Sequence, residues 1–95
     1  STTTTKEALH YYELYMKKYP QGKYRHATMM GIAMCKLSLK DVKGMLSMYR
    51  KLKKEAPNSF QVKQFKRIFR IEGLDPKTGK FKSQSNKSKK NGGKS

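Results

Sequence analysis

Lysine and arginine are the side chains whose number and spacing in this sequence point to a chemistry, the binding of a polyanion. The chain has 23 Lys and Arg against 6 Asp and Glu, a formal net charge of +17. Residues 77–95 hold seven of the bases and no acid, which leaves 16 bases against 6 acids, or +10, in residues 1–76. Such a chain repels itself unless a polyanion compensates it, most often nucleic acid and less often an acidic protein or an anionic membrane.

The bases are expected on helix faces. Lys43, Arg50 and Lys54 recur at steps of seven and four, which places them on one side of a helix. A single basic helix face is most often exposed to solvent without binding a ligand. Here two basic faces, a basic helix start and a basic tail occur together, and their electrostatic potentials add, which favours a polyanion. The predicted nucleic-acid-binding residues are Lys23, Arg25, His26, Lys43, Arg50, Lys54, Lys63, Lys66, Arg67 and Arg70.

Two further features concern how a nucleic-acid strand would be bound. Lys23, Arg25 and His26 stand where a helix begins, and its unpaired amides and positive dipole end favour a phosphate oxygen. The alternative, that they are only surface residues, stays open. Tyr11 and Tyr24 lie off the apolar stripes and are the candidates for stacking on bases.

Catalytic and metal-binding constellations are not expected. Glu7 and Asp41 suit helix caps and Asp75 suits a turn, so no two carboxylates form an acid and base pair. The soft ligands His10, His26 and Cys35 lack the spacing of a metal site. We therefore predict a chain that is not an enzyme and that binds no metal or cofactor.

Apolar residues at steps of three and four predict an all-α fold, a compact four-helix bundle. A Thr4 and Glu7 capping box, Ser38 followed by Asp41, and Asn58 or Ser59 are the expected helix starts. The helix over 23–37, apolar nearly all round, is expected at the centre. The predicted organisation is a linker over 1–4, the helical bundle over 5–76, and a turn with a basic low-complexity tail over 77–95.

The segment LDPKTGKF, residues 74–81, has Pro and Gly at positions typical of a tight turn. Either Leu74 and Phe81 form a miniature hairpin, or Phe81 folds back onto the bundle. The Lys, Ser, Asn and Gly tail is expected to be disordered, because it has no apolar area to bury.

The sequence also bears on location. Cys35 is the only cysteine, so no disulfide framework is expected. No apolar run is long enough to cross a bilayer, and the N-terminal residues lack the pattern of a secretory signal. We expect a cytoplasmic monomer.

Three segments resemble a known family: GKYRHA (22–27), LSLKDV (37–42) and APNSFQVKQFKRIFR (56–70). Together they are similar to the small helical domain that follows the catalytic domain in primases of plasmids, phages and mobile elements. The resemblance implies an accessory domain that grips template DNA, with nucleotide as an open addition, for a neighbouring primase active site. Our own interpretation of the residues favours single-stranded or junction DNA over a specific duplex site. The neighbouring primase catalytic domain, or a helicase, would be its protein partner.

Other hypotheses remain. The helices on either side of Pro20 and Gly22 look like a pair from a tetratricopeptide-like array, although no second copy follows. This pattern favours a protein interaction module that docks an acidic partner. Gln61, Gln64, Arg67 and Arg70 leave a helix-turn-helix-like contact with duplex DNA open. Electrostatic association of the tail with a membrane is the weakest hypothesis.

Overall fold

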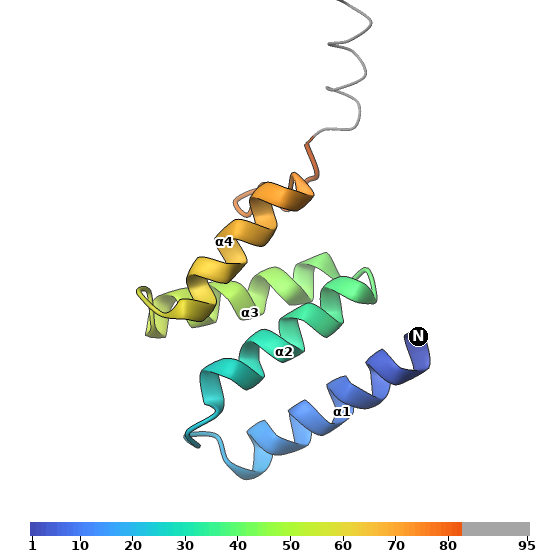
Figure 1. The fold of residues 1–95 in the computed structure, drawn as a ribbon, viewed down its shortest axis with the longest axis vertical. Coiled ribbons are helices and arrows are strands. Elements are labelled where there is room, and N and C mark those ends of the chain that lie inside the picture. Colours follow the sequence, from blue (N-terminus) through green and yellow to red (C-terminus); the bar gives the residue numbers. More distant parts are fainter. Residues whose placement is uncertain (83–95) are drawn as a thin grey trace, which may run out of the picture.

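The helices follow one another in space in the order in which they follow in the sequence. The computed structural model describes residues 1–82, which form α1 (Thr2–Lys18), α2 (Arg25–Ser38), α3 (Val42–Glu55) and α4 (Phe60–Glu72). Figure 1 shows α1, α2 and α3 as antiparallel neighbours, with α4 crossing α3 steeply. Within the described part of the chain α1 contacts no helix but α2, whereas α2 also contacts α3 and α4. The predicted all-α four-helix bundle is confirmed, with α2 at its centre.

The core lies between α2, α3 and α4. Its buried apolar side chains are Met29, Ile32, Ala33, Met45, Leu46, Tyr49, Leu52, Val62, Phe65, Phe69 and Leu74. The ring centroid of Tyr49 lies 5.1 Å from that of Phe65 and 4.8 Å from that of Phe69. These aromatic contacts join α3 to α4, so the outward faces of the two helices keep a fixed relation. By contrast, α1 has no fully buried residue.

The later helices begin and end at local capping residues, although Ser38, predicted together with Asp41 to cap the third helix, is instead the last residue of α2. The Asp41 carboxylate accepts a hydrogen bond from the Gly44 amide at 2.8 Å, and the Ser59 hydroxyl accepts one from the Val62 amide at 3.2 Å. Gly73 ends α4 with φ 68°, in the left-handed region that glycine adopts without strain.

The first helix begins earlier than predicted. The Ser1 hydroxyl accepts a hydrogen bond from the Thr4 amide at 3.3 Å, so Ser1 is the N-cap and Thr4 lies within the first turn. The linker predicted over 1–4 is therefore wrong, and so is the cap at Thr4. The physical reason is that Ser1 supplies the same hydroxyl acceptor three residues before Thr4.

A miniature hairpin follows α4. Leu74 and Phe81 form a single antiparallel bridge, and the Gly79 amide donates to the Asp75 carbonyl at 2.7 Å. The Phe81 side chain is 52% exposed, so it does not fold back onto the core. Of the two alternatives, the hairpin is thus the correct one. The remainder of the predicted tail, residues 83–95, lies outside the described residues.

Two phenylalanines of α4 test the position of the core. Phe65→Ala is expected to lower the free energy of unfolding by about 3–5 kcal/mol, because Phe65 is fully buried and its loss leaves a cavity. Phe60→Ala is the matched control and should change the stability by less than about 0.5 kcal/mol, since Phe60 is 67% exposed. Urea unfolding followed by circular dichroism measures both. Equal losses would show that the core is misplaced.

Candidate nucleic-acid interface

All predicted binding residues of α3 and α4 have exposed side chains. They are Lys43, Arg50, Lys54, Lys63, Lys66, Arg67 and Arg70, and we call this set the α3–α4 basic surface. Within residues 1–82 none of them takes part in an ion pair. Arg50 alone makes a side-chain hydrogen bond there, from Nη2 to the Pro76 carbonyl at 3.0 Å. The charges of this surface are therefore not neutralised by the described part of the protein.

The packing of the two helices decides where these bases lie. Residues of α3 and α4 that face the core, such as Tyr49 and Phe65, are buried against each other. The helical period then turns Lys54 and Lys63 away from the core. Because the aromatic contacts fix α3 against α4, bases from two separate helices belong to one rigid unit.

A pocket of about 440 Å³ lies where α3, α4 and the hairpin meet. Its basic lining residues are Lys53, Lys66, Arg70 and Lys82, and its apolar ones include Tyr49, Phe69 and Leu74. We call it the α3–α4 pocket. Lys66 and Arg70 were predicted as binding residues, whereas Lys53 and Lys82 were not. The signal for Lys53 is its position four residues after the core residue Tyr49, and its Nζ lies 5.9 Å from that ring's centroid.

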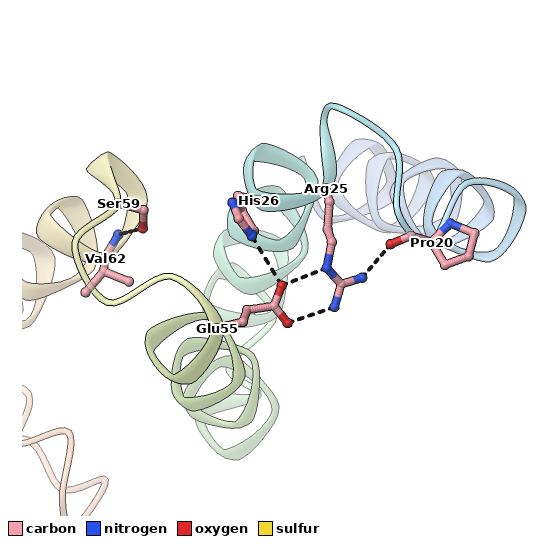
Figure 2. Close-up of polar contacts among 6 residues, drawn as sticks. All are labelled: Pro20, Arg25, His26, Glu55, Ser59 and Val62. Atoms are coloured by element: carbon pink, nitrogen blue, oxygen red, sulfur yellow. Dashed lines mark hydrogen bonds and ion pairs between the residues drawn. The ribbon is translucent and has the colours of Figure 1, made fainter.

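Arg25 and His26 have a partner inside the protein. Figure 2 shows the Arg25 guanidinium bound to both carboxylate oxygens of Glu55, from Nε at 2.7 Å and from Nη2 at 2.9 Å. Arg25 Nη1 donates to the Pro20 carbonyl at 2.6 Å, and His26 Nε2 lies 3.2 Å from Glu55 Oε1. These contacts occupy the Arg25 and His26 side chains, which a phosphate grip at this helix start would need free. Lys23 makes no ion pair within the described residues and lies over the Tyr24 ring, 5.2 Å from its centroid.

Antiparallel packing explains the pair. The start of α2 lies beside the end of α3, so Arg25 meets Glu55 across the two helices. A cation at a helix start and an anion at a helix end each oppose the helix dipole, and pairing offsets both costs. The Arg25 hydrogen bonds lower the pKa of Glu55 from its usual 4.5 to about 2. The sequence does carry a signal for this contact. Glu55 is an acid in the last turn of α3, before Pro57, and Arg25 is a base in the first turn of α2.

The two stacking candidates are exposed but lie in different places. Tyr11 is 67% exposed and Tyr24 is 57% exposed. Tyr24 directly precedes Arg25 and so lies near the end of α3, through the Arg25 pair with Glu55. Tyr11 is on α1, which contacts α2 but neither α3 nor α4. The Tyr24 ring itself lies beside that of Tyr15 of α1, with centroids 6.4 Å apart, so it is on the α1 side of this connection.

Three further findings concern the described part of the chain. No group of three or more His, Cys, Asp or Glu side chains within residues 1–82 could hold a metal ion. Cys35 is half-buried, and burial raises the pKa of its thiol. None of the helices there has both the length and the apolar character that crossing a membrane requires.

The contribution of the ion pair between Arg25 and Glu55 to stability should be lost at low pH. Glu55→Gln is expected to lower the free energy of unfolding at neutral pH by on the order of 1 kcal/mol, since the pair is partly exposed. Because the folded-state pKa is depressed, this contribution is present above about pH 4.5 and is lost as the pH falls toward about 2. The difference between wild type and variant, measured by urea unfolding at several pH values, should shrink over that range. Glu72→Gln is the control, and a Glu55→Gln difference that does not depend on pH would contradict the assignment.

Comparisons with known proteins add no family at this point. Searches against protein-family models, curated proteins and solved structures found no match. The resemblance to the primase domain thus stays a prediction. What bears on function is the charge, exposure and packing of the residues described above.

Proposed function

We propose that the protein binds nucleic acid through the α3–α4 basic surface. The observation that carries the proposal is a set of exposed bases on two helices joined by aromatic packing, with no ion pair to any of them within residues 1–82. Neutralising phosphates with such side chains releases counterions, which supplies affinity without sequence reading. The charge of the whole chain, +17, supports the same ligand.

Nucleic acid suits this surface better than an acidic protein does. Stable protein interfaces depend on aromatic or other apolar anchors at their centre. The rings that join α3 to α4, such as Phe65, are buried. The exposed large apolar side chains of these two helices are Phe60 and Ile71, which lie at opposite ends of α4 and so do not form one central anchor. A repeating phosphate backbone needs no such anchor. We therefore rank the interaction module second, although helices packed in chain order are what a helical-repeat-like unit would show.

Within this proposal a single strand is the favoured ligand. Tyr24 is exposed at the start of α2 and offers a ring on which an unpaired base could stack. A role in replication, as an accessory domain beside a primase active site, rests on the sequence resemblance and is proposed on that ground alone. Such a domain needs to hold template DNA and needs no catalytic groups of its own.

Charge removal at matched positions tests the proposed surface. In the full chain, Lys54→Gln, Lys63→Gln and Arg67→Gln together should weaken binding to single-stranded DNA and make the slope of log K against log salt shallower by about 2. The control removes the same charge from α1 by Lys6→Gln, Lys17→Gln and Lys18→Gln, all exposed. Fluorescence anisotropy at several salt concentrations measures both variants.

The outcomes separate the alternatives. Equal losses in the two triple variants would mean that net charge alone, and not the proposed surface, governs binding. No loss in either would mean that binding depends on neither set of three bases, and would contradict the proposed surface. No affinity of wild type for DNA or RNA at low salt would remove the nucleic-acid proposal and favour the interaction module.

A further inference from the structure

The α3–α4 pocket differs from the open surface around it because basic side chains from three separate segments converge there. Lys53 comes from α3, Lys66 and Arg70 come from α4, and Lys82 follows the hairpin. None of these side chains forms an ion pair within the described residues. Such convergence from distant parts of the chain is not a consequence of the helical period.

One acidic residue also lines the pocket. The Asp75 carboxylate accepts a hydrogen bond from the Lys77 amide at 2.9 Å through Oδ1, so one of its oxygens is already bonded to the hairpin backbone. Four basic residues against one acid leave the lining with a formal charge of +3. The local preference is therefore for an anion with more than one negative charge.

Apolar side chains line the same pocket. Phe69 and Leu74 each have only 4% of their surface exposed and belong to the core, so this side of the pocket is firmly supported. The volume, about 440 Å³, is in the range of pockets that take small molecules. A cationic side next to an apolar side matches a ligand that carries a phosphate on a less polar body.

We propose that the α3–α4 pocket binds the terminal phosphate monoester of a nucleotide, either at the 5′ end of a strand or in a free nucleotide. This inference rests on the proposed nucleic-acid binding and names a site within it. A monoester carries about −1.5 to −2 charges at pH 7, whereas each phosphodiester of the backbone carries one. Arg70 can bind two phosphate oxygens with its planar guanidinium, and Lys66 adds a compact charge one turn earlier on α4.

The test compares two oligonucleotides that differ only at the 5′ end, one with a phosphate and one with a hydroxyl. Wild-type full chain should bind the 5′-phosphorylated strand about five-fold more tightly or better, as expected for charge-assisted hydrogen bonds. Lys66→Gln and Arg70→Gln should each bring this ratio close to one. Lys43→Gln is the matched control, because Lys43 belongs to the basic surface but does not line the pocket. This variant should lower the affinity for both oligonucleotides equally and leave the ratio of the two affinities unchanged.

A competition arm distinguishes the two sources of the phosphate. If a free nucleoside monophosphate abolishes the 5′ preference and the nucleoside does not, the free nucleotide is a ligand of the pocket. If it has no effect while the preference persists, the strand end is the ligand. Either result supports the site.

Other results overturn the site and do so separately from the proposed function. Equal affinity for the two strands, or a preference that survives in both pocket variants, together with no NMR shift at Lys66 or Arg70 on titration with nucleoside monophosphate, would overturn the phosphate site while strand binding stands. If neither strand binds, the proposed function fails. In that case, titration of the chain with nucleoside monophosphate, followed by NMR, tests phosphate binding in the pocket independently of strand binding. Shifts at Lys53, Lys66 and Arg70 would support it, and their absence would overturn it.

Discussion

The ion pair between Arg25 and Glu55 fixes the end of the molecule at which α2 begins and α3 ends. Arg25 binds both oxygens of Glu55 and also the Pro20 carbonyl, so one guanidinium joins α2, α3 and the connection from α1. The same contact occupies Glu55, the acid next to Lys53 and Lys54 in the sequence. The pair thus stabilises the fold and leaves the charge of α3 unbalanced.

Acids elsewhere are also used by the fold. Asp41 caps α3, and Asp75 accepts a hydrogen bond within the hairpin. With 6 acids against 23 bases in the chain, few carboxylates remain to neutralise the α3–α4 basic surface. Mutual repulsion of these bases destabilises the folded state, and a bound polyanion would remove that repulsion. Binding should therefore stabilise the fold, since a ligand that prefers the folded state shifts the unfolding equilibrium.

Local chemistry explains which features could be predicted from the sequence. The cap at Ser59 and the glycine end at Gly73 depend on neighbouring residues and are found as predicted. Of the predicted pair Ser38 and Asp41, Asp41 caps α3 and Ser38 ends α2. The start of α1 could not be chosen locally, because Ser1 and Thr4 offer the same capping hydroxyl. The contact of Arg25 with Glu55 spans 30 residues and depends on antiparallel packing of two helices. The α3–α4 pocket needs a hairpin that folds beside both helices, and no local pattern shows this.

Locating bound nucleic acid on the protein tests the proposed α3–α4 basic surface most directly. The measurement is a map of backbone amide shifts by NMR, recorded while a single-stranded oligonucleotide is added to the full chain. We expect changes at exposed residues of α3 and α4, such as Lys54, Lys63 and Arg67, with Lys6 and Lys17 of α1 little affected. Changes confined to α1 or to residues 83–95, with α3 and α4 unchanged, would contradict it.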